Sequence, residues 1–233
     1  MYKYELPLVR GRFIRRYKRF LVDVELDDGR LVTAHTTNTG SLKSCLVPGA
    51  PVLLSDHGDA PRKTRYTWES IRIGDTWVGV NTTVPNRLTG IALRQGLLEP
   101  FRSFDRIRAE VKHVRSRLDF YLENDRERMF LEVKNVTYRE GRYALFPDAP
   151  TARGLKHLEE LTGLLARGYR AGMLYIVGRT DVEVFAPAAH IDAAYARALK
   201  EAVAQGVEIY PYQVRYDEHG ARFTGLLPVD WTL

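Results

Sequence analysis

The stretch that decides the fold reads SRLDFYLENDRERMFLEVKNV over residues 116–136. Two largely apolar runs, at 117–122 and 129–136, flank a polar segment, and this pattern predicts two strands joined as a β-hairpin. If the hairpin closes symmetrically around the polar segment, Asp119 lies directly opposite Glu132 on one face of the sheet. Directly opposed carboxylates repel each other. A divalent cation bound between them would turn this repulsion into a binding site.

Lys134 completes the set, because it follows Glu132 by two residues and strand alternation puts both on one face. Cleavage of a phosphodiester requires a hard cation held by carboxylate oxygens, and a nearby Lys polarises water and the scissile phosphate. The pattern therefore predicts a nuclease-type site in which Asp119 and Glu132 bind Mg²⁺ (or Mn²⁺), with no other cofactor. A solvated strand face with ordinary surface charges is the alternative for the same residues.

The segments around the hairpin predict a mixed sheet flanked by helices, because helix, three strands, helix and strand follow one another. The spacing of Phe104, Ile107, Val111 and Val114 predicts a helix over 103–114. Glu110 lies at the edge of its apolar face, in reach of the same site. The other expected elements are a strand at 143–146, a helix at 151–167, a strand at 171–177, a helix at 191–204, and strands at 207–215 and 221–227.

The expected helix at 151–167 begins at Thr151, a residue type suited to the N-cap. Arg153 and Lys156 lie in its first turns, where a helix N-terminus favours a phosphate. His157 lies at the border of the apolar stripe and suits either the site or a structural role. An ordinary amphipathic helix with surface charges is the alternative for Arg153 and Lys156.

The first third of the sequence predicts a small β-barrel of the OB type, a common platform for nucleic acid. Gly and Asp turns separate short apolar runs, and no helix is predicted there. Residues 77–90 are interpreted as the join to the second domain, which gives domains at 1–82 and 83–233. The expected strands lie at 8–14, 20–26, 31–35, 51–55 and 67–73.

Basic side chains gather at the start of the chain, where the first twenty residues hold seven Lys and Arg but only one acid. Such a cluster suits a polyanion, because each neutralised phosphate releases a counterion. An edge strand guarded by charge is the equal alternative. The residues expected to contact nucleic acid, interleaved with Tyr17 and Phe20, are Arg15, Arg16, Lys18 and Arg19.

The composition excludes several classes of protein. The net charge is +6, the single cysteine is Cys45, and there is no apolar run near 18 residues in length. A disulfide framework and a membrane span are therefore not expected, and the start lacks the features of a secretory signal. These properties predict a cytoplasmic protein. Neither a P-loop nor a G-x-G-x-x-G fingerprint is present, so nucleotide cofactors are not indicated.

Several short sequence blocks, distributed over nearly the whole chain, resemble in sequence and order those of the bacterial and archaeal sugar fermentation stimulation protein (SfsA) family. The sequence departs from the family pattern at two places. Thr36-Thr37 stands where Cys-Pro is usual, and Pro150 and Ala152 stand where the family has Val and Glu. The second departure removes an acidic side chain near the expected site. The blocks are Arg16–Phe20, Asn38–Gly40, Pro48–Gly49, Asn81–Thr82, Pro85–Asn86, Ser116–Phe120, Glu132–Asn135, Phe146–Ala149, Arg153–Gly154 and Lys156–Leu158.

The resemblance implies an OB-like amino-terminal domain and a carboxyl-terminal domain similar to the PD-(D/E)XK nuclease fold. The matching motif positions are Glu110, Asp119, Glu132 and Lys134. It also implies DNA binding and a link to the regulation of sugar-utilisation genes.

Three functions stay open from the sequence. The first is a Mg²⁺-dependent nuclease acting on DNA, with RNA less favoured, in which Arg117, Arg153 and Lys156 grip phosphates. The second is a DNA-binding regulator of sugar-utilisation genes that keeps the nuclease-like fold without turnover. The third is a small-molecule or protein-interaction domain with an incidental basic face. The sequence leaves homodimer formation open.

Overall fold

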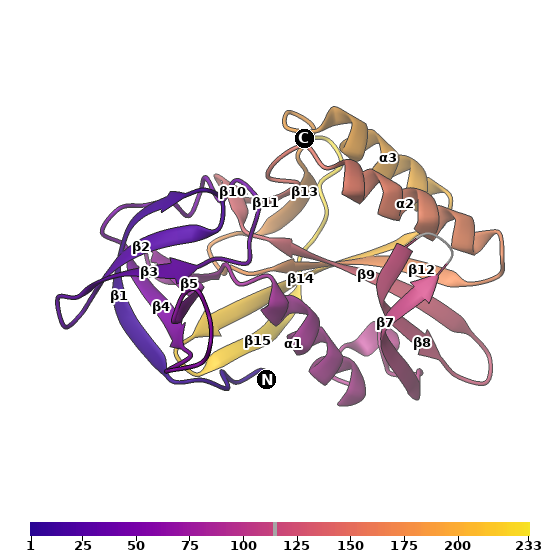
Figure 1. Cartoon of the computed structure of the whole chain (residues 1–233). Helices are drawn as coiled ribbons and strands as arrows, with labels where there is room; N and C mark the ends of the chain where they lie inside the picture. Colours follow the sequence, from indigo (N-terminus) through magenta and orange to yellow (C-terminus); the bar gives the residue numbers. More distant parts are fainter. Residues whose placement is uncertain (114–115) are drawn as a thin grey trace.

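The computed structural model describes residues 1–113 and 116–233 and has two lobes (Figure 1). The amino-terminal lobe is a β-barrel, and the carboxyl-terminal lobe is a mixed sheet covered by helices. This is the two-domain fold class expected from the sequence. Within the described residues, no helix combines the length and apolar character needed to cross a membrane.

The barrel consists of five strands in the order β3-β2-β1-β4-β5, closed by a parallel pairing of β3 with β5. Alternate side chains point inward; Val22 and Val24 on the second strand are buried against Phe13 and Trp68. All five predicted strands are therefore confirmed. Their bounds are β1 (Leu8–Tyr17), β2 (Leu21–Leu26), β3 (Leu31–His35), β4 (Pro51–Asp56) and β5 (Tyr66–Ile73).

The second lobe has a central sheet in the order β7-β8-β9-β12-β14, with β15 beside β14. Strands β9, β12 and β14 are parallel, whereas the first two are antiparallel to their neighbours. The strands are β7 (Arg106–His113), β8 (Ser116–Glu123), β9 (Arg128–Val136), β12 (Arg170–Val177), β14 (Glu208–Asp217) and β15 (Gly220–Leu226). The helices are α1 (Thr83–Arg94), α2 (Ala152–Leu165) and α3 (Ala193–Ala204), with a 3-10 turn η1 (Glu99–Phe101).

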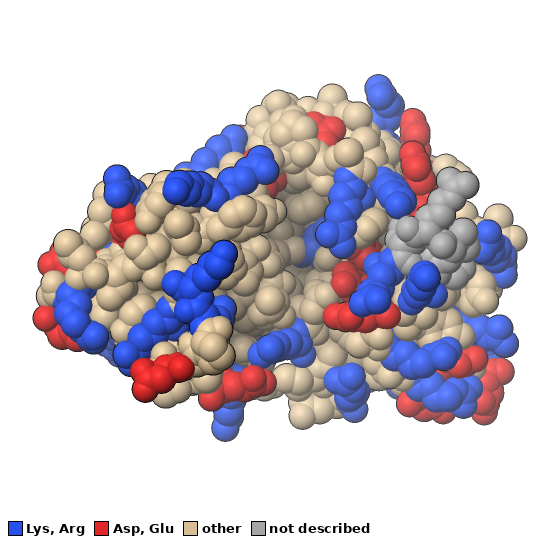
Figure 2. All heavy atoms as spheres, in the orientation of Figure 1, with Lys and Arg blue, Asp and Glu red and all other residues tan. Residues whose placement is uncertain are grey.

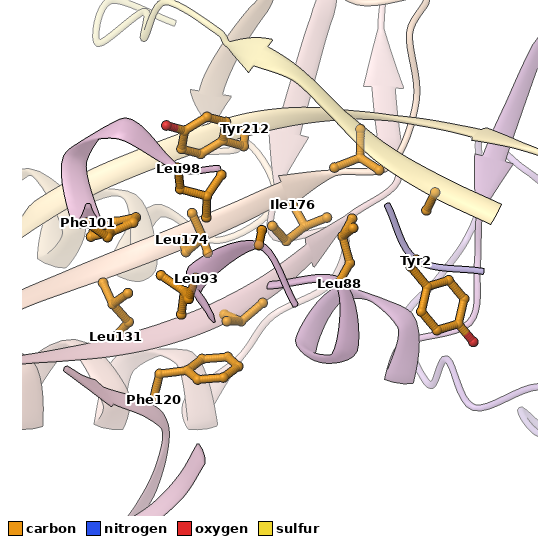
Figure 3. Close-up of a cluster of buried hydrophobic side chains, with 14 of the residues drawn as sticks. Tyr2, Leu88, Leu93, Leu98, Phe101, Phe120, Leu131, Leu174, Ile176 and Tyr212 are labelled. Atoms are coloured by element: carbon orange, nitrogen blue, oxygen red, sulfur yellow. The ribbon is translucent and has the colours of Figure 1, made fainter. Parts of the chain in front are cut away.

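Helix α1 covers one face of this sheet. Its side chains Leu88 and Leu93 pack toward Leu131 on β9 and toward Leu174 and Ile176 on β12 (Figure 3). All five side chains are almost completely removed from water, and apolar burial of this kind is the main stabilising contribution to folding. The packing fixes the start of α1 next to the middle of the sheet.

Helices α2 and α3 cover the opposite face (Figure 1). Leu158 and Leu161 of α2 and Leu199 of α3 pack on Met173 and Tyr175 of β12. Strand β12 is therefore buried on both faces, which confirms the interpretation of its continuous apolar run. The Thr151 hydroxyl accepts a hydrogen bond from the Gly154 amide, which confirms the expected N-cap of α2.

The predicted helix over 103–114 is wrong, because this segment forms the edge strand β7. Ile107, Ala109 and Val111 alternate with charged residues, so the segment also has the period of a strand, and pairing with β8 decides between the two. Charged side chains are typical of an exposed edge. Val114, part of the same prediction, lies outside the described residues.

Residues 77–90, interpreted as the join between the two domains, contain regular structure that the sequence did not predict. Strand β6 (Thr76–Gly79) pairs with β5, and α1 begins four residues after it ends. The expected order, which began with a helix at 103–114, is therefore not met, because the five strands β7 to β11 lie between α1 and α2. The predicted strand at 143–146 is confirmed as β11 (Tyr143–Phe146), which lies in a small separate sheet with β10 (Tyr138–Glu140) and β13 (Val184–Pro187).

The two lobes share backbone hydrogen bonds. Trp77 of β6 pairs with Tyr216 of β14, so the barrel strands and the second sheet form one continuous ladder. Near the start of the chain, the Tyr2 amide and carbonyl pair with those of Ala221. Both pairings fix the barrel to the second lobe.

Candidate functional site

The site lies where β8 separates from β9. The ladder between them pairs Phe120 with Leu131 and ends there, which confirms the symmetric closure of the hairpin up to this pair. Asp119 is therefore not a ladder partner of Glu132, unlike in the sequence interpretation. Its carboxylate instead accepts a hydrogen bond from the Val133 backbone amide, at 2.8 Å.

Asp119 is also bound by α1, whose Asn86 donates its side-chain amide to Asp119 Oδ1 at 2.6 Å. Helix α1 therefore reaches the site from one side of the sheet. Burial raises the pKa of Asp119 to about 6, and the negative charge of Glu132 adds to this rise. The carboxylate thus lies close enough to Glu132 for the two charges to interact.

Glu132 lies on the side of the sheet covered by α2 and is buried. Its Oε1 atom accepts a hydrogen bond from Lys134 Nζ at 2.5 Å and contacts Nδ1 of His157 on α2. Lys134 Nζ is also 3.0 Å from the same His157 nitrogen. Burial acts to raise the pKa of Glu132, but the His157 hydrogen bond and the Lys134 charge hold it below its usual value.

The second carboxylate oxygen of Glu132, Oε2, is buried and has no hydrogen-bond partner among the residues that the structure describes. A buried carboxylate oxygen without a partner is costly. Glu132 therefore presents an unused acceptor beside Asp119, and a bound cation would compensate for its burial.

These side chains line a cavity of about 330 Å³ between the two lobes. One wall carries Asp119, Glu132 and Lys134, and the opposite wall is a loop of the barrel, Asn38–Gly40, termed the wall loop below. Figure 2 shows the molecule hollowed between its lobes, with Lys and Arg side chains gathered on both sides of the hollow. A negatively charged ligand is therefore favoured here.

The wall loop is held from both lobes. In the barrel, Arg16 donates to the Asn38 carbonyl and to the Gly40 carbonyl, both at 2.7 Å. From the second lobe, Asp148 Oδ2 accepts a hydrogen bond from the Leu42 amide at 3.0 Å. The wall is thus fixed in place relative to the carboxylates on the other side of the cavity.

Glu110 and Arg117 of the expected site lie outside the cavity wall. Glu110 is on β7 at the level of Asp119, because the pairs on either side join Ala109 to Phe120 and Val111 to Leu118. Its backbone has a positive φ of 53°, and its exposed carboxylate accepts a hydrogen bond from Arg117 at 3.1 Å.

On α2, Arg153 lines the cavity, and its Nε lies 3.5 Å from His157 Nε2. Lys156 is exposed on the same helix and is not part of the described cavity wall. Arg153 is therefore the better placed of the two to meet a phosphate inside the cavity.

The four basic residues of the barrel that are expected to bind nucleic acid differ in their exposure to solvent. Arg16 is half-buried and uses its guanidinium on backbone carbonyls of the barrel, whereas Arg15 is exposed and pairs with Asp23 at 2.9 Å. Lys18 and Arg19 are exposed at the turn between β1 and β2. The structure therefore places Arg16 in the support of the wall loop and leaves the other three at the surface.

Sequence reasoning missed several residues of the site. Asn86 was missed because α1 was not predicted. The wall loop was seen only as a block shared with a family, and no part in the site was predicted for it. Asp148 was seen only as part of a block shared with a family, and its contact with Leu42 joins segments more than 100 residues apart.

The donor set fits a hard divalent cation. Asp119 uses each oxygen for one hydrogen bond, and a carboxylate oxygen can accept two. In the described part of the chain no cluster of three or more His, Cys, Asp or Glu side chains is present. Mg²⁺ is commonly held by one or two carboxylates and keeps several waters, so Asp119 and Glu132 suffice.

Family models match both lobes. Residues 83–220 match the model described as the sugar fermentation stimulation protein RE domain, and residues 14–80 match the SfsA N-terminal OB domain. Asp119 lies on β8, and Glu132 and Lys134 lie on β9, within the part of the chain that matches the first of these models.

Relatives cover nearly the whole chain. The sugar fermentation stimulation protein homolog of Geotalea uraniireducens is 46% identical over 225 residues, 96% of this chain and 97% of that protein. The homolog of Rhodospirillum rubrum is 49% identical over 218 residues, 88% and 89% of the two chains. The structure of Pyrococcus furiosus SfsA in complex with Ca²⁺ superposes with a TM-score of 0.89, at 30% identity and 98% coverage of both chains.

Proposed function

Because the chain belongs to the sugar fermentation stimulation protein family, we propose that it is a metal-dependent nuclease that hydrolyses phosphodiester bonds in DNA. The observation that carries the proposal is the pair of carboxylates, half-buried Asp119 and buried Glu132, beside Lys134 in one cavity. Buried carboxylates are costly without compensation. A cation-binding role accounts for their burial and for the free oxygen of Glu132.

Asp119 and Glu132 would hold Mg²⁺ or Mn²⁺. That the related Pyrococcus furiosus structure is in complex with Ca²⁺ supports a divalent cation in this family. The cation would supply Lewis-acid chemistry, lowering the pKa of water and neutralising charge on the scissile phosphate.

The remaining residues of the cavity have separate tasks in this proposal. Lys134 donates hydrogen bonds to the phosphate or to the attacking water. Arg153, at the opening of the cavity, holds a neighbouring phosphate. Asn86 and His157 keep the two carboxylates in position through their hydrogen bonds.

The barrel would bring DNA to this cavity. Arg15, Lys18 and Arg19 are exposed on it, and contacts with phosphates would give binding that weakens with salt. The wall loop connects this surface to the cavity that also contains Asp119 and Glu132.

A cleavage assay tests the proposal. The full chain is incubated with single-stranded, duplex and branched DNA and with RNA, in Mg²⁺, Mn²⁺ or chelator. We expect metal-dependent cleavage of DNA that falls by at least about 100-fold in Asp119→Asn, Glu132→Gln and Lys134→Met, the size of effect typical of charge-stabilising groups.

Asp125→Asn is the matched control, because Asp125 is an exposed carboxylate at the other end of the same hairpin. It should leave cleavage unchanged. Binding of DNA without cleavage in any metal, on every substrate, would overturn the proposal and support a DNA-binding regulator without turnover.

A further inference from the structure

An aromatic pair lies at the basic end of the barrel. Phe20 is 47% exposed, although large apolar side chains are usually buried. Its ring is nearly parallel to that of His35 on β3, with an interplanar angle of 12° and a centroid separation of 6.4 Å. His35 thus supports Phe20 from one side and leaves much of its surface exposed to solvent.

The turn before Phe20 holds two cations in an unusual backbone conformation. Lys18 and Arg19 have positive φ values of 48° and 63°, a region that residues other than glycine seldom adopt. The Phe20 amide donates to the Lys18 carbonyl at 2.8 Å, and Arg16 donates to the Arg19 carbonyl at 3.0 Å. Strain of this kind persists where surrounding contacts enforce it, often at binding sites.

This turn is connected directly to the cavity. The Thr36 amide donates to the Phe20 carbonyl, and the chain then runs from His35 into the wall loop. Because Asn38 follows His35 by three positions, their Cα atoms lie within about 11 Å of each other. Arg16 binds both the turn and the wall loop.

We infer that Phe20, supported by His35, is a stacking platform for an unpaired nucleobase, and that the substrate has a single-stranded stretch next to the scissile bond. This inference rests on the proposed action on DNA. Every base has a π-face that stacks on an aromatic ring, but inside a duplex both faces are covered by neighbouring bases. Lys18 and Arg19 neutralise the phosphates on either side of the stacked base.

Binding measured without cleavage tests this platform. Fluorescence anisotropy is recorded in chelator with a labelled single strand of mixed sequence and with the duplex of the same sequence. Phe20→Ala should weaken binding of the single strand by about five-fold or more, the effect of losing one stacked base. Binding of the duplex should change less than about two-fold, and Phe20→Trp should restore binding of the single strand.

The matched control is Leu31→Ala, because Leu31 is 73% exposed on the same barrel but is not aromatic. It should bind both DNAs like the unmodified protein. Arg19→Gln should weaken both DNAs and lower the salt dependence of binding, whereas Phe20→Ala should keep that dependence, because stacking releases no counterions.

The inference would be overturned if Phe20→Ala weakened binding of both DNAs equally or of neither. It would also be overturned if the unmodified protein did not bind the single strand. Matching melting temperatures of the variants ensure that a loss reflects binding rather than folding. Because chelator is present throughout, an absence of catalysis cannot mimic any of these results, and the proposed nuclease activity is tested separately.

Discussion

Gly40 of the barrel lies against the carboxylate of Asp148 in the second lobe, so closely that a β-carbon on Gly40 would be 2.6 Å from Asp148 Oδ1. The contact joins the wall loop to the segment between β11 and α2. Space for a methyl group at this place requires the Asp148 carboxylate to shift, and this carboxylate also holds the Leu42 amide.

Gly40→Ala is therefore expected to lower the free energy of unfolding by about 1–3 kcal/mol, the usual cost of overpacking. Cleavage of DNA should fall even at temperatures where the variant is fully folded, because the wall loop shifts. Thermal melts and the cleavage assay check both effects. Gly163→Ala is the control, since a β-carbon there meets nothing within 4 Å. Because alanine favours a helix more than glycine does, this substitution should raise the free energy of unfolding by up to about 1 kcal/mol.

Asp119→Asn should stabilise the metal-free protein at neutral pH. The pKa of Asp119 is raised from 3.8 to about 6, so the folded state binds more protons than the unfolded state between these values. Stability due to this group is therefore lost as pH rises through that window. Above this pH window, the free energy of unfolding of the asparagine variant should exceed that of the unmodified protein by about 1–2 kcal/mol. This is somewhat less than the free energy that corresponds to a shift of about two pKa units.

Melting temperatures recorded from pH 4 to pH 8 in chelator measure this difference. The gap between Asp119→Asn and the unmodified protein should widen with rising pH and narrow again when Mg²⁺ is added, because the cation binds only the carboxylate form. A gap that stays constant with pH would contradict the assignment of the raised pKa to Asp119. Asp125→Asn should show no such widening.

Arg16→Met and Arg15→Met should differ although the residues are neighbours. Arg16 donates to the partly buried carbonyls of Asn38 and Gly40 and to the exposed carbonyl of Arg19, and its loss removes all these hydrogen bonds. We expect a loss of about 2–4 kcal/mol in the free energy of unfolding. Arg15 is 70% exposed and its ion pair with Asp23 should contribute at most about 1 kcal/mol. Denaturant titrations of both variants compare them.

Arg153→Gln should weaken DNA binding without unfolding the protein. Removal of one phosphate contact should lower the slope of log affinity against log salt by about 0.7–0.9. Anisotropy titrations at several salt concentrations measure this slope. Lys200→Gln, an exposed cation on α3 away from the cavity, should leave the slope as it is; an equal change in both variants would show a general charge effect.

The grouping of three candidate site residues could be predicted from local patterns. Alternation along two strands was enough to bring Asp119, Glu132 and Lys134 into one cavity. The detail that failed is the direct pairing of the two carboxylates. The ladder between β8 and β9 ends one residue earlier, and Asp119 binds the Val133 amide instead.

Helix α1 could not be predicted, because its sequence contains poor helix formers. Thr83, Val84, Pro85 and Gly90 have low intrinsic helix propensity. Its helical form depends on packing of its apolar side chains against the sheet, which local sequence does not reveal. Asn86, the residue of α1 that binds Asp119, was missed for the same reason.

The backbone pairing of Tyr2 with Ala221 sets the order in which a newly synthesised chain can mature. The ribosome releases the amino-terminal end first, yet this residue finds its partner only after residue 221 has been made. The free edge of β6 must likewise wait for β14. The contacts that join the two lobes are therefore completed only late in translation.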